Sequence, residues 1–245
     1  MANGASISIA QDTDAHLWQF SHQPATREEE LRWKGIVLAA AGIAMLSGTA
    51  LAAWKEHPYK DLGFAVEFPD EPAVATGTYR TVLVNSAPVH IYSQKQDGAT
   101  FIASVVDLQD RAGEGASLLI EAEFNLGLLG DVSANEISRV EPGKSAVFGH
   151  FITIDCRNDK APDQPGQTEA AHKWFKAISG VDCPAKGRLT VNLLFNRGRL
   201  YLIQGINPPN PDGGPALSPA ALRFANSVSL YQADGTRNRA DGGGG

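Results

Sequence analysis

The sequence is poor in cysteine, in blocks of like charge and in motifs that mark catalysis. Only 2 of its 245 residues are cysteine, which excludes a disulfide-dense scaffold but allows one disulfide bond. No run of Lys and Arg occurs and the formal net charge is −6, so nucleic acid is not an expected partner. There is no G-x-S-x-G nucleophile elbow, and Gly113-Glu114-Gly115 lacks the rest of a phosphate-binding glycine loop. We therefore expect a chain that is not an enzyme and that carries no cofactor.

One long stretch without charge is present near the N-terminus, from Gly35 to Trp54. As a helix rising 1.5 Å per residue it would span about 30 Å, which is the thickness of a bilayer core. A buried helix of a soluble protein usually shows a polar face, and this stretch has none. The pattern predicts a membrane segment with two alternatives left open. It is either a signal peptide cut after Ala52, following Ala50-Leu51-Ala52, or a transmembrane anchor that is retained.

Small residues and flanking charges bear on the anchor alternative. Four small residues recur at every fourth position, on one helix face where another membrane helix can pack closely: Ala40, Ala44, Gly48 and Ala52. Basic residues are slightly more frequent before the segment (Arg27, Arg32, Lys34) than after it (Lys55, Lys60). This bias favours a cytoplasmic N-terminus. We expect an inner-membrane anchor with a periplasmic C-terminal domain or, after cleavage near Ala52, release into the periplasm.

The remainder of the chain divides into two tails and one domain. Residues 1–34 are polar and are expected to form a cytoplasmic or disordered tail. Residues 59–231 are expected to form the extracytoplasmic domain, because apolar periodicity is confined to them. Residues 232–245 end in four glycines and are expected to be a disordered tail.

Alternating apolar residues predict that the domain is rich in strands. Single strands are expected over residues 62–68, 99–108, 132–140 and 147–156. Two hairpins are expected, one around Asn85-Ser86 and one around Asn196-Arg197-Gly198. These strands follow one another with short connections, which is typical of an antiparallel sheet.

Helical periodicity interrupts the strands in three places. Leu118, Leu119, Ala122 and Leu126 recur at helical spacing, and Gly130 is the expected C-cap of that helix. A second helix is expected over residues 169–178. A third is expected to begin at Ser218 with Pro219 in its first turn, and to direct Leu222 and Phe224 inward. The order of elements predicts an α+β fold, an antiparallel sheet flanked by helices and preceded by one N-terminal apolar helix.

Three short motifs resemble a known type of domain. They are GFAVEFP over residues 63–69, GRLYL over residues 198–202 and LRFANSV over residues 222–228. Extracytoplasmic bacterial domains with such motifs are similar in layout to the PsbP/Mog1-like sandwich, a sheet flanked by helices. The resemblance covers about residues 59–231 and implies a binding or assembly module without catalytic residues, often attached to a membrane complex. The polar insert at residues 158–187 is longer than in such domains.

Cys156 and Cys183 admit two interpretations. In an oxidising compartment two such cysteines pair by default, and closing the loop between them contributes roughly 3–4 kcal/mol. The alternative is a metal site, because His150 and His172 lie in the same region and zinc binds Cys and His. No C-x-x-C or H-x-x-x-H pair prepares such a site, so the sequence favours the disulfide and predicts no bound metal.

Two segments carry residues suited to contact with a partner. Trp174 and Phe175 stand in the polar insert, where they form either a small core beneath a long loop or a contact patch. The loop Asn207–Pro215 is rich in Pro, Asn and Gly and is expected to be exposed and partly rigid.

The sequence therefore favours a membrane-tethered extracytoplasmic protein-interaction module, an accessory or assembly subunit of an envelope membrane complex. Its expected partners are the membrane, through residues 35–54, and an envelope protein. The alternative is a periplasmic carrier of a small ligand or lipid. A carrier requires a cavity between the sheet and its helices, so the packing of that layer decides between the two.

Overall fold

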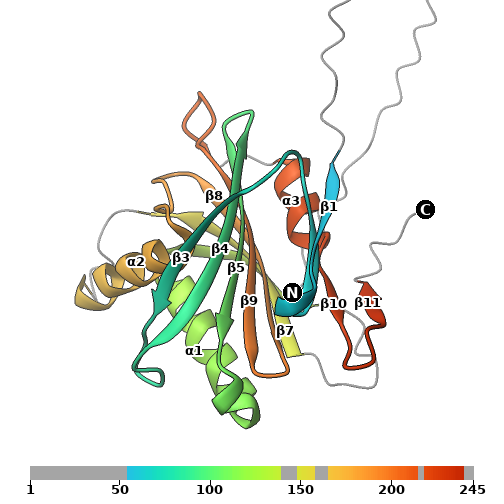
Figure 1. Ribbon diagram of the computed structural model, residues 1–245. Helices are drawn as coiled ribbons and strands as arrows, with labels where there is room; N and C mark the ends of the chain where they lie inside the picture. The colour runs from blue at the N-terminus through green and yellow to red at the C-terminus, as the bar shows by residue number, and fades with distance from the viewer. Residues whose placement is uncertain (1–53, 139–147, 158–164, 215–217, 240–245) are drawn as a thin grey trace, which may run out of the picture. The chain divides into compact units, whose positions relative to one another are not determined.

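The computed structural model describes residues 54–138, 148–157, 165–214 and 218–239 (Figure 1). Of the expected membrane segment only Trp54 is described. The tail 1–34 and the small residues Ala40, Ala44, Gly48 and Ala52 lie outside the described residues. Within these ranges no helix is both long enough and apolar enough to span a bilayer.

The described residues form strands, three α-helices and two short 3₁₀ helices. The strands are β1 Lys55–Tyr59, β2 Phe64–Phe68, β3 Ala73–Tyr79, β4 Ala87–Gln96, β5 Ala99–Asp107, β6 Gly130–Ile137, β7 Phe148–Cys156, β8 Arg188–Asn196, β9 Arg199–Asn207, β10 Ser229–Tyr231 and β11 Arg237–Arg239. The helices are η1 Lys60–Leu62, η2 Gln109–Glu114, α1 Gly115–Gly127, α2 Pro165–Ser179 and α3 Pro219–Asn226. The α+β class predicted from the sequence is confirmed.

Seven strands form one antiparallel sheet in the order β3-β4-β5-β9-β8-β7-β6. The predicted β8–β9 hairpin is confirmed, with Asn196 opposite Arg199. Arg197 and Gly198 have φ of 52° and 73°, the left-handed conformation that a two-residue hairpin turn requires. The β3–β4 hairpin is also confirmed, with its loop close to the predicted turn.

Helices α1 and α2 cover one face of this sheet (Figure 1). The predicted spacing is confirmed, because Leu118, Leu119, Ala122 and Leu126 are all buried. The helix ends earlier than predicted: Leu128 is its C-cap, and Gly130 begins β6 instead. Gly130 serves the strand instead, since a Cβ at this position would collide with the backbone of Asp155 on β7.

The opposite face carries α3 and a second sheet with the order β1-β2-β10-β11 (Figure 1). The sequence predicts one sheet and not this one. Strand β1 begins at Lys55, before the predicted start of the domain, and β11 lies inside the tail expected to be disordered. A tight turn explains β11: Gly235 has φ of 80°, and Gln232 N–H donates to the carbonyl of Thr236 at 2.8 Å.

Helix α3 begins as predicted and turns a different side inward. The Ser218 side chain accepts the Ala221 N–H at 3.4 Å, and Phe224 is fully buried. The prediction that Leu222 faces inward is wrong, because this side chain is 50% exposed. The buried stripe consists of Ala221, Phe224 and Ala225, at spacings of three and four, and Leu222 lies beside that stripe.

Candidate interaction surface

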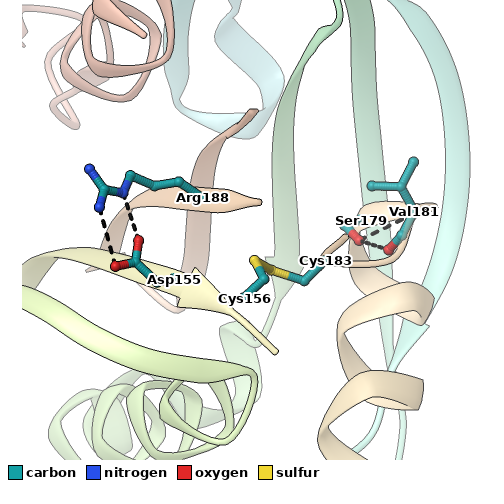
Figure 2. The surroundings of a disulfide bond; sticks show 6 residues. All are labelled: Asp155, Cys156, Ser179, Val181, Cys183 and Arg188. Carbon is teal, nitrogen blue, oxygen red and sulfur yellow. Dashed lines mark hydrogen bonds and ion pairs between the residues drawn. A yellow bond between two sulfur atoms is a disulfide. The ribbon is translucent and has the colours of Figure 1, made fainter. Parts of the chain in front are cut away.

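Cys156 and Cys183 form a disulfide bond, with Cα atoms 5.8 Å apart (Figure 2). Cys156 ends β7 and Cys183 lies just beyond α2. The backbone around them is paired as well, because the Cys156 N–H donates to the carbonyl of Gly187 and the Lys186 N–H donates to the carbonyl of Cys156, both at 2.8 Å. The predicted pairing is confirmed, and it fastens the end of α2 to the large sheet.

Because Cys156 and Cys183 are bonded to each other, neither is free to bind a metal ion as a thiolate. His150 instead makes polar contacts with its neighbours: its Nδ1 lies 2.9 Å from Asn135 Oδ1 and 3.5 Å from Glu123 Oε2. His172 lies on α2. Across the described ranges no three His, Cys, Asp or Glu side chains are grouped to hold a metal ion.

Trp174 and Phe175 belong to the core between α2 and the sheet. Phe175 has no exposed surface, and the Trp174 ring meets Tyr79 edge-on with centroids 6.1 Å apart. Burial raises the pKa of Tyr79 above its usual value, with Glu121 adding to the effect, so this phenol stays neutral. Both aromatics therefore form core, and the contact-patch interpretation has no exposed ring to support it.

The proline-rich loop lies at the surface, as expected for it. Pro208, Pro209 and Pro211 are exposed and line a groove of about 630 Å³. Trp54 lines the same groove, where its ring meets Phe101 edge-on at a centroid distance of 5.1 Å. The sequence places Trp54 at the end of the membrane segment, and the structure shows that it is already part of the domain.

The outer face of α1 exposes two large apolar side chains one helical turn apart. Ile120 is 67% exposed and Phe124 is 55% exposed. Strand β6 adds Val132 at 48%, and the loop after β3 adds Leu83 at 39%. A Cβ on Gly127 would lie 3.9 Å from a Val132 methyl group, so β6 continues the apolar surface beyond the helix. We call Leu83, Ile120, Phe124 and Val132 the α1 ridge.

Two carboxylates on either side of the ridge hold its neighbours in place. Glu121 accepts hydrogen bonds from the Thr81 hydroxyl at 2.5 Å and from the Leu83 N–H at 2.9 Å. Glu123 accepts a hydrogen bond from the Asn135 side chain on β6. Hydrogen bonds to charged groups are among the stronger ones in proteins. The ridge is therefore a preformed surface in which loop, helix and strand are tied together.

The α1 ridge is not among the sites predicted from the sequence. The prediction for α1 concerned only the residues expected to face the core. A signal was available, since Ile120 and Phe124 stand four residues apart and away from the inward Leu118 and Ala122. The buried stripe of α1 serves the core, and Ile120 and Phe124 form a second apolar stripe that the core does not use.

The layer between the large sheet and its helices is filled. Leu126, Phe175, Leu193 and Leu202 have no solvent-accessible surface, and they belong to one continuous cluster. A side chain without accessible surface borders no water-sized void. Beside these four side chains, between α1, α2 and the large sheet, the described residues leave no lipid-sized cavity.

Comparison with known proteins supplies no family for this geometry. No protein-family model, curated protein or solved structure matches the chain.

Proposed function

We propose that this chain is a membrane-tethered extracytoplasmic module that binds a protein, as an accessory or assembly subunit of an envelope membrane complex. The α1 ridge is the observation that carries the proposal. Several large apolar side chains exposed on and beside one helix are typical of interaction sites. Burying a side chain such as Ile120 or Phe124 against a partner would contribute about 1.5–3 kcal/mol.

Strand β6 extends the same surface. It is the last strand at its end of the large sheet among the described residues, so its outer edge presents backbone donors and acceptors next to the ridge. Val132 and Ile137 are both exposed on this strand. We infer that the partner packs across α1 and β6 together and offers apolar side chains to Ile120 and Phe124.

The proposed tether rests on the uncharged segment at residues 35–54, which leads directly into the domain. The segment ends at Trp54, which already packs on Phe101, and β1 begins at the next residue, Lys55. A retained anchor would tether the domain to the membrane, and cleavage after Ala52 would release the same domain. The Cys156–Cys183 bond suits an oxidising compartment such as the periplasm.

We also infer that the layout is PsbP/Mog1-like. In support, the GFAVEFP motif forms β2, the LRFANSV motif contributes most of α3, and helices lie on both faces of an antiparallel sheet. That resemblance implies a binding or assembly role without catalytic residues, which agrees with a docking ridge.

The test is a native gel of complexes from detergent-solubilised membranes that contain the full chain. We expect the wild type to migrate in a complex and the Ile120→Ser/Phe124→Ser double variant to migrate as the free chain. Leu222→Ser is the matched control, because it also replaces a half-exposed helical residue, on α3. A wild type that runs only as a free monomer, or a double variant that keeps the complex, would contradict the proposal.

A further inference from the structure

A polar notch of about 400 Å³ opens where the β8–β9 turn meets η1 and β10. Its lining includes three cationic side chains and three neutral polar ones: Lys60, Arg197, Arg199, Gln109, Asn196 and Tyr201. The lining contains no carboxylate. Positive charge is thus concentrated at one place on a chain whose net charge is −6.

The chain builds this notch from a rigid turn. Arg197 and Arg199 stand on either side of Gly198 in the hairpin, and the Leu108 N–H donates to the Gly198 carbonyl at 2.7 Å. Gly63 faces them with φ of 78°, and a Cβ there would lie 3.4 Å from Arg199 Nη1 and 3.2 Å from the Tyr201 hydroxyl. A glycine at this position keeps the notch open and keeps the backbone unstrained.

Several polar atoms in the notch have no protein partner. Asn196 is 2% exposed and its Oδ1 accepts no hydrogen bond from the described residues, and the buried Nε of Arg199 donates none. In the described part of the chain, Lys60, Arg197 and Arg199 form no ion pair with a carboxylate. Asp107 stands opposite Arg199 across the β5–β9 pairing. Buried polar groups without a hydrogen-bond partner are costly, and an anion can accept from the Arg199 Nε–H, whereas the Asn196 oxygen needs a donor.

We propose that this notch binds a phosphate group, carried by a small phosphorylated molecule or by a lipid headgroup. A guanidinium presents paired donors that match phosphate oxygens, and a phosphate dianion balances a tricationic lining better than a single carboxylate does. The Asn196 amide can rotate so that its NH₂ group faces an anion. The volume lies in the usual range for small-molecule sites, about 300–1,000 Å³, so it exceeds what a bare ion fills.

Phosphate binding at the notch does not depend on the protein-interaction proposal, because the notch and the α1 ridge share no residue. The notch can therefore bind phosphate whether or not the ridge docks a partner. The Ile120→Ser/Phe124→Ser variant changes no residue of the notch. A negative result in the native gel therefore counts against the interaction proposal alone, and a negative titration counts against the phosphate proposal alone.

Isothermal titration of the detergent-solubilised full chain with inorganic phosphate and with glycerol 3-phosphate tests the site. We expect saturable binding by the wild type and about tenfold weaker binding by Arg199→Gln and by Arg197→Asn. Asn tolerates the left-handed conformation at position 197, so that variant keeps the turn and remains informative if Arg199→Gln fails to fold. Lys95→Gln is the control, because it removes one exposed charge at the opposite end of the β4–β5–β9 strands.

The control should bind within about twofold of the wild type, since an exposed charge at that distance is screened. No saturable heat with either titrant up to about 10 mM, or equal binding by all four proteins, would overturn the proposal. A titration with short-chain phosphatidic acid below its micelle concentration identifies the source. Tighter binding than glycerol 3-phosphate, lost in Arg199→Gln, supports a lipid headgroup, and the reverse order supports a free phosphorylated molecule.

Discussion

The two faces of the large sheet are packed with different kinds of side chain. The face under α1 and α2 is filled mostly by Leu, Ile and Val and is closed by the Cys156–Cys183 bond. The face under α3 and the small sheet is built around rings: Phe64, Phe68, Tyr92, Phe101, Tyr201 and Phe224. Figure 1 shows these coverings on opposite sides of the sheet.

This difference coincides with where the surface is hollowed. Tyr201 lines the polar notch, and Phe101 lines the groove beside the proline-rich loop. Tyr59 and Tyr92 line a further hollow of about 600 Å³. The rings of the aromatic face meet at an angle, as Phe101 and Phe224 do at 48°. These three hollows are therefore lined in part by residues of the aromatic core or by rings packed against it.

Removing one ring from the aromatic side should have the largest effect on stability. Phe224 is fully buried, and its centroid lies 4.9 Å from that of Phe68 and 5.3 Å from that of Phe101. Phe224→Ala should lower the free energy of unfolding by about 3–5 kcal/mol, measured by denaturant unfolding. Leu193→Ala is the counterpart on the aliphatic side and should cost less, because no ring pairs are lost. A larger loss for Leu193→Ala would reverse the ranking of the two faces.

Removing the disulfide bond should destabilise the face covered by α1 and α2. The Cys156→Ala/Cys183→Ala double variant should be less stable by about 2–4 kcal/mol, because the bond closes a long loop across residues 156–183. Hydrogen exchange should show faster opening of α2 than of α3, since α2 is the helix that the bond holds. Equal acceleration in both helices would mean that the two faces unfold as one unit.

Gly205 on β9 lies where α3 approaches the large sheet so closely that no room is left for a side chain. A Cβ on Gly205 would lie 2.6 Å from Ala221 Cβ and 2.7 Å from Ala221 Cα. Gly205→Ala should therefore cost about 1–3 kcal/mol in thermal or denaturant unfolding. Gly166→Ala in α2 is the control, because a Cβ there meets nothing within 4 Å and should be neutral or stabilising by up to about 1 kcal/mol. A tolerated Gly205→Ala would show that α3 can move away from the sheet.

On both sides of the large sheet, the elements with a local sequence signal could be predicted. The spacing of Leu118 to Leu126 and the Asn-Arg-Gly turn at 196–198 are local signals, and both are confirmed. In the small sheet the alternating residues of β2 give a local signal, which is confirmed, but β11 has none, because it is three residues long and reads Arg-Asn-Arg. The pairs β1–β2 and β10–β11 of this sheet are local, but the sheet is completed only by pairing between distant segments, as when Leu230 meets Phe64. The polar notch was not predicted either, because its residues are far apart in the sequence: Lys60 and Arg199 come from opposite ends of the domain.

Tyr201 links the aromatic core to the notch and gives this side of the sheet a pH dependence. Its hydroxyl donates to the Leu62 carbonyl at 2.9 Å. Burial raises the pKa of Tyr201 to about 12, although the neighbouring Arg199 acts in the opposite direction. The folded state therefore keeps this proton more firmly than the unfolded chain, whose tyrosines ionise near pH 10. The stabilisation from the neutral phenol is complete below pH 10 and is lost as the pH rises towards 12.

Tyr201→Phe should have the smallest effect at neutral pH. The variant loses one hydrogen bond to the Leu62 carbonyl, so it should be about 1 kcal/mol less stable than the wild type at pH 7. Above about pH 10 the wild type should lose stability by up to about 1.4 kcal/mol per pH unit relative to the variant, which has no phenol to ionise. The two denaturation midpoints should therefore converge and then cross before pH 12. A constant difference between pH 7 and pH 11 would show that Tyr201 ionises normally in the folded protein, and that the aromatic core admits water at the notch.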